Sequence, residues 1–289
     1  MTPRVTRISQ LLLVLGCALA LKLHYATASP DQLRWILAPT TLLVELLTGV
    51  SFTFESYAGY MSSDHTFLIA ASCAGVNFLI TAFLMLTLRR LWTGRARSIG
   101  WSFIPSMALL VYVFTLVANT TRICVALRMR AIPRHEGWLD PNQLHRSEGI
   151  FLYFGFLLLL FMLTERSNSA TFSDVLRRSL FPLVIYYATT FGVPLANGAY
   201  RQGREFWEYS LFVFFIPLLL IVAVAALNSS WLKRRLRLRS RKRSGSAGGP
   251  PAVFNPERCR AGGPPALPAR CTAWHSAAKI EVLRRHEDV

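Results

Sequence analysis

The sequence predicts an all-α fold, a polytopic transmembrane helical bundle. Its 289 residues are 53% hydrophobic and only 16% charged, and its mean hydropathy is positive. A soluble domain of this length carries more charge and interrupts its apolar runs more often. Several runs here reach the roughly 20 residues that cross the hydrocarbon core of a bilayer. Basic residues cluster just after these runs, as they do in the cytoplasmic loops of membrane proteins.

The apolar runs predict six to seven membrane segments, with eight as the upper bound. The clearest segments are 67–88, 99–121, 148–165, 180–198 and 209–227. A further run at about 8–24 is interpreted as an uncleaved span rather than a signal peptide. The run at 33–50 is apolar but is interrupted by Pro39 and Glu45. A broken or re-entrant helix therefore competes with a full span at this position.

The basic loops predict the orientation of the bundle. Segments 89–98, 166–179 and 228–243 contain four, three and eight basic residues. The positive-inside rule assigns them to the cytoplasm and leaves 51–66, 122–147 and 199–208 outside. The 122–147 segment nevertheless keeps five arginines, Arg122, Arg128, Arg130, Arg134 and Arg146. Arginine that is costly to translocate usually has a function. Arg4 and Arg7 fall outside if 33–50 crosses the membrane and inside if it is re-entrant.

The chain is predicted to comprise a transmembrane domain, 1–243, and a disordered cytoplasmic tail, 244–289, rich in Gly, Pro, Ala and Arg. The basic run "WLKRRLRLRSRKR" could bind nucleic acid. Because it follows a membrane segment, contact with anionic membrane lipids is the preferred interpretation, without a nucleic-acid partner. No CxxC or Cys/His pair has the spacing of metal ligands, so neither a metal nor a cofactor is expected.

Three reactive side chains fall at the predicted outer face: Cys73, Arg122 and His145. Cys73 is expected about two turns inside the segment 67–88, Arg122 at the end of the next segment, and His145 just before the one after it. A nearby cation favours the reactive thiolate of a cysteine. A guanidinium can donate to the oxyanion formed when a thiolate attacks a carbonyl, and an imidazole can transfer a proton. The expected product is a thioester, resolved by water or by another amine.

Five neighbouring residues are candidates for substrate binding: Gly75, Asn77, Asn119, Glu148 and Gly149. The two amides lie three or four residues from Cys73 or Arg122, a spacing that predicts a shared helix face. The glycines allow close approach of backbone or substrate. Glu148 follows His145 by three residues and could orient its imidazole.

Each of these residues also has a structural interpretation. A lone cysteine in an apolar helix is usually a packing residue, and an arginine at a helix end usually reaches the headgroups. Cys124 is a rival thiol, and His65 and His135 are rival imidazoles. Asp64 with His65 could instead bind substrate or a cation.

Three stretches resemble the exosortase/archaeosortase family of membrane transpeptidases, most closely the exosortase K group. They are "DHTFLIAASCAGVNFLITAF" (64–83), "VANTTRI" (117–123) and "LHRSEGIFLYF" (144–154). The family pattern is a Cys in a Cys-x-Gly setting, an Arg after an Asn in a later helix end, and a His before a further span. These map to Cys73, Arg122 and His145. The resemblance covers roughly residues 33–165 and does not extend to the tail.

The resemblance implies a cysteine endopeptidase that acts as a transpeptidase in the bacterial inner membrane, with its active site facing the periplasm. Family substrates are secreted proteins with a C-terminal motif, a hydrophobic helix and a basic cluster. Cleavage would form an acyl-enzyme at Cys73 and transfer the substrate to a surface acceptor. The substrate helix would lie in the bilayer beside 67–88.

Two other functions compete with this interpretation. In the first, the chain is a transporter or channel in which the outward arginines bind an anionic solute, although no symmetric repeat of the kind that transporters use is evident. In the second, it is a non-catalytic subunit of a membrane assembly, and "SCAGVNF" (72–78) is a helix-packing face.

Overall fold

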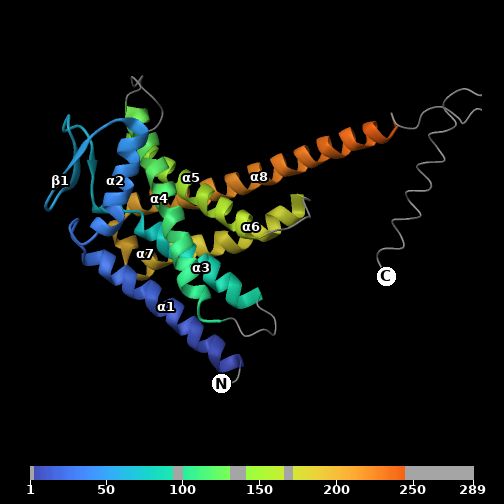
Figure 1. Cartoon of the computed structure of the whole chain (residues 1–289), viewed down its shortest axis with the longest axis horizontal. Coiled ribbons are helices and arrows are strands. Elements are labelled where there is room, and N and C mark those ends of the chain that lie inside the picture. Colours follow the sequence, from blue (N-terminus) through green and yellow to red (C-terminus); the bar gives the residue numbers. More distant parts are fainter. Residues whose placement is uncertain (1–2, 94–99, 131–140, 166–171, 245–289) are drawn as a thin grey trace, which may run out of the picture. The chain divides into compact units, whose positions relative to one another are not determined.

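The computed structural model describes residues 3–93, 100–130, 141–165 and 172–244, and it is predominantly helical (Figure 1). The helices are α1 (Pro3–Thr27), α2 (Arg34–Thr48), α3 (Val76–Thr93), α4 (Phe103–Arg130), α5 (Pro141–Thr164), α6 (Phe172–Tyr187), α7 (Val193–Ala196) and α8 (Arg204–Ser244). The chain divides into two compact units, Met1–Arg237 and Leu238–Val289. Everything described below belongs to the first unit. The predicted tail lies outside the described residues apart from Ser244.

Within the described residues, six helical segments are long and apolar enough to cross a membrane, which confirms the prediction of a multi-pass transmembrane helical bundle. They are Val5–Thr27, Ala71–Thr93, Phe103–Met129, Arg146–Thr164, Phe172–Ala196 and Phe206–Leu227. The ambiguous run at 33–50 forms the shorter helix α2, which contains Pro39 and is not among these segments. With six crossings, Arg7 lies on the same side as Arg89. The C-terminal ends of α1 and α4 and the N-terminal ends of α3 and α5 share the opposite side, named here the Cys73 face.

A small antiparallel sheet lies between α2 and α3, where only a loop was expected. Its strands are β1 (Phe52–Glu55), β2 (Gly59–Ser62) and β3 (Leu68–Ile69), in the order β1-β2-β3. Phe54 pairs with Tyr60 across the first hairpin, and their rings lie 5.0 Å apart. Such aromatic cross-strand pairs stabilise a hairpin. Glu45 also has a structural role, because its Oε1 accepts the backbone N–H of Phe52 at 2.7 Å.

The start of α3 differs from the predicted helix at 67–88. The chain leaves β3, forms the 3-10 turn η1 (Ala71–Cys73), and begins α3 only at Val76. Gly75 has a φ of +72°, a left-handed conformation that breaks the helix between Cys73 and Asn77. The expectation that Cys73 lies two turns inside a helix is therefore wrong, and so is the helix face expected to join it to Asn77.

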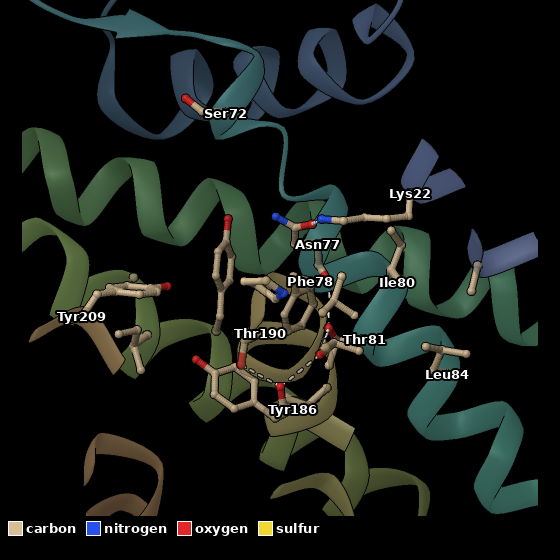
Figure 2. A pocket seen from close by; sticks show the side chains of 18 of the residues that line it. Lys22, Ser72, Asn77, Phe78, Ile80, Thr81, Leu84, Tyr186, Thr190 and Tyr209 are labelled. Atoms are coloured by element: carbon tan, nitrogen blue, oxygen red, sulfur yellow. Dashed lines mark hydrogen bonds between the residues drawn. The ribbon is translucent and has the colours of Figure 1, made fainter. Parts of the chain in front are cut away.

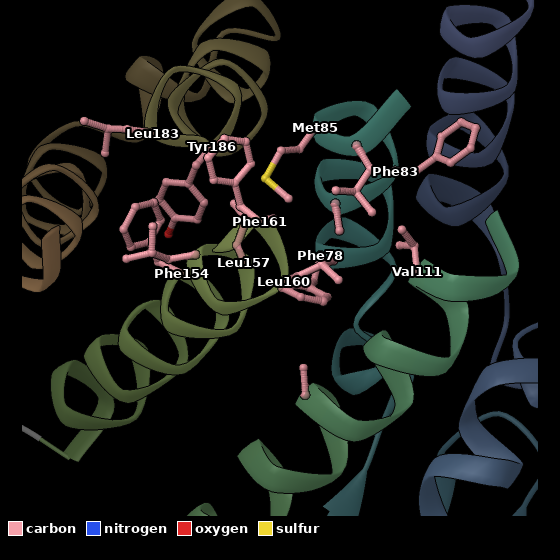
Figure 3. Packing of buried hydrophobic residues seen from close by; sticks show 14 of the residues in the cluster. Phe78, Phe83, Met85, Val111, Phe154, Leu157, Leu160, Phe161, Leu183 and Tyr186 are labelled. Carbon is pink, nitrogen blue, oxygen red and sulfur yellow. The ribbon is translucent and has the colours of Figure 1, made fainter. Parts of the chain in front are cut away.

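Two hydrophobic clusters hold the bundle together. The larger one joins α3, α5 and α6, and Figure 3 shows Phe154, Leu157 and Phe161 of α5 beside Tyr186 of α6, with Met85 of α3 facing them. The smaller one packs α2 against the start of α3 and the end of α4. Leu79 and Leu84 of α3 pack against both clusters, so this helix connects them.

Helix α1 is at the edge of the bundle. It packs chiefly against α3, through Val14 and Ala18 among others. Leu12, Leu19 and Leu23 on α1 remain 64%, 60% and 62% exposed. Exposed leucines on a membrane-spanning helix suit contact with lipid chains, which are as apolar as leucine itself.

The substitution Gly59→Ala is expected to destabilise the sheet. A Cβ at this position would lie 2.4 Å from the Ile69 carbonyl oxygen, and the φ of +124° is strained for an alanine. We expect a loss of about 1–3 kcal/mol, measured as a lower unfolding temperature by tryptophan fluorescence in detergent. Gly155→Ala is the matched control, since a Cβ there meets nothing within 4 Å. Equal unfolding temperatures for the two variants would contradict the sheet.

Candidate functional site

Cys73 lies at the end of the 3-10 turn that precedes α3, half-buried and with a free thiol. Its backbone N–H donates to the Ala70 carbonyl at 2.8 Å. Its own carbonyl accepts a 2.6 Å hydrogen bond from the Asn119 side-chain Nδ2 on α4. The amide therefore attaches the turn that carries the thiol directly to the neighbouring helix.

A chain of polar side chains continues from Asn119 to α5. Asn119 is fully buried, and its Oδ1 accepts a 2.8 Å hydrogen bond from the Tyr153 hydroxyl. The same hydroxyl accepts a bond of 3.2 Å from an Arg122 Nη1. The Arg122 guanidinium also lies over the Tyr153 ring, 5.2 Å from its centroid. Buried polar groups need such partners, and a fully connected network holds its members in one geometry.

Two glycines allow the helices to approach this network closely. A Cβ at Gly75 would lie 3.1 Å from the Asn119 Cγ. A Cβ at Gly149 would lie 3.3 Å from the Arg122 Nε. Both contacts are tighter than ordinary van der Waals packing. The glycines predicted to make room for substrate therefore make room for Asn119 and Arg122.

Electrostatic contacts connect the same residues. Arg122 interacts with Cys73, with Tyr153 and with Glu148. The Tyr25 hydroxyl of α1 lies 3.5 Å from the carbonyl oxygen of Ala71, in the turn that carries Cys73. The structure thus brings together Cys73, Asn119, Arg122 and the glycines, although these residues come from distant parts of the sequence.

A cavity of about 560 Å³ opens beside this network (Figure 2). Its wall includes residues of α1, α3, α4, α5, α6, α7 and α8, among them Lys22, Asn77, Arg122, Arg146, Gly149, Tyr153, Tyr186, Thr190 and Tyr209. Ser72 lines the cavity but Cys73 itself does not. Cys73 is thus adjacent in sequence to a residue of the cavity wall without being part of that wall.

Asn77 has a partner of its own in the cavity wall. Its Oδ1 accepts a 2.8 Å hydrogen bond from the Lys22 ammonium of α1, and Figure 2 shows the two side chains pointing toward each other. The Lys22 ammonium also lies 5.8 Å from the centre of the Tyr25 ring. Asn77 thus lies beside the cavity, as a substrate-binding residue would, but the structure joins it to Lys22 rather than to Cys73.

The far wall of the cavity is an irregular stretch of helix. A π-helical segment (Ala188–Gly192) joins α6 to α7, and Thr189 within it shares a 2.8 Å hydrogen bond with Thr81 of α3. Such π-turns are found frequently at functional sites. Here the segment directs Thr189 and Thr190 into the cavity wall.

The remaining predicted residues have different outcomes. His145 lies within α5, four residues before Gly149 and so on the same helix face, but its side chain lies outside the described residues. Glu148 lies near Arg122, as its electrostatic contact shows. His135 lies outside the described residues. Cys124 packs against the smaller hydrophobic cluster, as a structural cysteine would.

The alternative pair Asp64 and His65 lies in the turn between β2 and β3. The Asp64 carboxylate accepts hydrogen bonds from the Ser62 hydroxyl and from the hydroxyl and backbone N–H of Thr66. These bonds, led by that from Ser62, lower the pKa of Asp64 to about 2. The carboxylate is therefore ionised at neutral pH and already engaged in the turn. His65 is exposed with a φ of +54°.

Sequence reasoning missed two polar residues of this region, Tyr153 and Lys22. Tyr153 follows Gly149 by four residues, so helical spacing from the glycine could have indicated it. Lys22 is the first lysine in the chain and stands within an apolar run. An ionisable residue within a membrane segment is by itself a signal of function.

Comparisons with protein-family models, with curated proteins and with solved structures find no match for this chain. Among the described residues, no group of three His, Cys, Asp or Glu side chains is placed to hold a metal ion. The side chains that the structure does place together here are a half-buried thiol, a nearby guanidinium, and a polar network that holds both.

We expect Tyr153→Phe to destabilise the site. The variant keeps the ring, which stacks on Phe78 and lies under Arg122, but removes the hydroxyl that both Arg122 and Asn119 bind. A buried acceptor that loses its donor costs about 1–3 kcal/mol, which thermal unfolding in detergent can detect. Tyr57→Phe, at a tyrosine that is 91% exposed, is the control and should unfold like the wild type. A wild-type unfolding temperature for Tyr153→Phe would argue against the network.

Proposed function

We propose that this protein is an integral membrane cysteine protease-transpeptidase that cleaves C-terminal sorting signals of secreted proteins. One observation carries the proposal: a half-buried thiol and a guanidinium from separate segments are held near each other at one face of a membrane bundle. Asn119 and Tyr153 hold them there. A cysteine that served only to pack helices would need neither the arginine nor the buried network around it.

The spatial arrangement adds support to the short sequence motifs. Cys73, Arg122 and the start of α5 lie at the same face, the order and placement that the family resemblance implies. His145 shares the face of α5 that carries Gly149, and the position of Gly149 adjoins Arg122.

The proposed reaction runs through a thioester. The Cys73 thiolate attacks the scissile carbonyl carbon, and Arg122 donates hydrogen bonds to the oxyanion that forms. The guanidinium has five N–H donors, and one of them donates to the Tyr153 hydroxyl, which holds the group in position. His145 gives a proton to the leaving amine as the C–N bond breaks. An acceptor amine or water then attacks the thioester and releases the thiol.

The membrane would position the substrate. We place the chain in the bacterial inner membrane, with the Cys73 face toward the periplasm, because the strongly basic segments at 89–98 and 228–243 belong to the opposite side. A substrate with a C-terminal hydrophobic helix could lie in the bilayer beside α3. Its scissile bond would then be at the level of Cys73, and its basic cluster on the cytoplasmic side. A surface acceptor would take the cleaved product.

A second candidate is a transporter for an anionic solute. The observation that favours it is the presence of Lys22, Arg122 and Arg146 in the cavity wall. This function needs no thiol. Loss of anion uptake in Arg122→Ala, with normal uptake in Cys73→Ala, would favour the transporter over the protease.

Cys73→Ala and Cys73→Ser are expected to abolish processing while leaving the protein in the membrane. Alanine has no nucleophile, and a serine hydroxyl is a much weaker nucleophile than a thiolate in a site built for cysteine. The measurement is the cleavage of a co-expressed secreted protein with a C-terminal motif, helix and basic cluster, followed by immunoblotting.

Cys124→Ala provides the matched control, because this second thiol packs against the hydrophobic cluster and should be dispensable. Arg122→Lys should also reduce processing strongly, since an ammonium cannot reproduce the guanidinium geometry over Tyr153. Unimpaired processing by Cys73→Ala would refute the proposed function.

A further inference from the structure

Basic side chains gather at the cavity without matching acids. Lys22 of α1, Arg122 of α4 and Arg146 of α5 line it, and no Asp or Glu is among the described residues of its wall. Glu148 lies near Arg122 but does not line the cavity. Of these three cations, Lys22 and Arg146 are therefore the two whose positive charge is least compensated by a nearby carboxylate.

Lys22 has only uncharged partners among those that the structure records. Its ammonium donates to the Asn77 amide oxygen and lies near the Tyr25 ring. Arg146 lies with its guanidinium 6.0 Å from the Tyr209 ring centre. Figure 2 shows Lys22 and Tyr209 on opposite sides of the cavity, and Arg146, near Tyr209, lines the cavity as Lys22 does. A cation within a membrane segment is costly unless an anion is nearby.

The same cavity has an apolar side that faces the lipid. Leu15, Ala18, Leu19 and Lys22 follow one another at helical spacing along the face of α1 that lines it. Leu15 and Leu19 are 45% and 60% exposed, and α1 packs chiefly against α3. The wall that α1 provides is thus a single helix at the edge of the bundle, beside the acyl chains.

The polar and the apolar parts of the cavity lie at different depths in the membrane. Arg146 begins the membrane segment of α5, and Lys22 lies five residues before the end of α1, about 7 Å from it. Leu15 lies about 10 Å deeper than Lys22. The charged end is therefore at headgroup level and the apolar end within the hydrocarbon, which is the polarity of a lipid in the same leaflet.

From this arrangement we infer that the cavity binds the phosphate headgroup of an anionic phospholipid between Lys22 and Arg146, with an acyl chain along Leu15 and Leu19. Basic pockets between transmembrane helices recognise anionic headgroups in this way. The volume of about 560 Å³ accommodates a headgroup and the first part of the chains, not a whole lipid, so the rest would remain in the bilayer. The cavity wall includes Arg122, which the proposed cleavage also uses, but lipid binding itself needs no turnover.

Native mass spectrometry of the detergent-purified full chain tests this inference. Phosphatidylglycerol is the probe, phosphatidylcholine is the lipid without net charge, and inorganic phosphate is the soluble anion. Wild-type protein should retain phosphatidylglycerol in preference to phosphatidylcholine. Lys22→Gln and Arg146→Gln should each weaken that retention roughly tenfold, because each removes a charge-assisted bond. Lys22→Arg should retain it.

Arg201→Gln is the matched control. Arg201 lies in the connection between α7 and α8 and does not line the cavity, so its loss should leave binding unchanged. Equal retention of the two lipids, or wild-type retention by both Lys22→Gln and Arg146→Gln, would overturn the inference. Displacement of phosphatidylglycerol by inorganic phosphate would identify a soluble anion as the occupant and would also overturn it. Cys73→Ala should bind lipid normally, so a failure of lipid binding and a failure of the proposed cleavage are distinguishable.

Discussion

The hydrogen bond from the Asn119 amide to the Cys73 carbonyl is the contact on which the site depends. The 3-10 turn ends at Cys73 and α3 begins at Val76. The left-handed conformation of Gly75 separates the two elements. Near a membrane, backbone polar groups must find partners within the protein. Asn119 supplies one from α4, and Tyr153 connects the same amide to Arg122 and to α5. One buried amide thus positions the thiol relative to the guanidinium.

The rest of the fold supports that contact from two sides. The larger hydrophobic cluster places α5 against α3, and the smaller one places α2 against α4. The sheet connects α2 to the turn that carries Cys73, with Glu45 bonded to the first residue of β1. At the opposite side of the bundle, Arg89 of α3 forms an ion pair with Glu165 after α5. The cavity on the Cys73 face, by contrast, has basic residues but no acids in its described wall.

The sequence was sufficient to predict the membrane segments, because a run of about 20 apolar residues matches the thickness of the hydrocarbon core and is rare in soluble domains. It also indicated that Cys73, Arg122 and Asn119 are neighbours. For Cys73 that prediction assumed a helix at 67–88, whereas the residue lies in a 3-10 turn before α3. Gly75 was interpreted as room for substrate, whereas its left-handed φ breaks the helix. The sheet was missed because its strands are only two to four residues long, too short for a periodic pattern. The partners of Tyr153 and Lys22 depend on tertiary contacts that no local pattern encodes.

The most direct test of the central claim is the intact mass of the protein during turnover of a substrate with a C-terminal motif, helix and basic cluster. We expect an adduct that adds the mass of the cleaved product less one water, attached to the peptide containing Cys73 and released by hydroxylamine, as a thioester would be. An adduct on a different residue, or processing of the substrate without participation of Cys73, would contradict it.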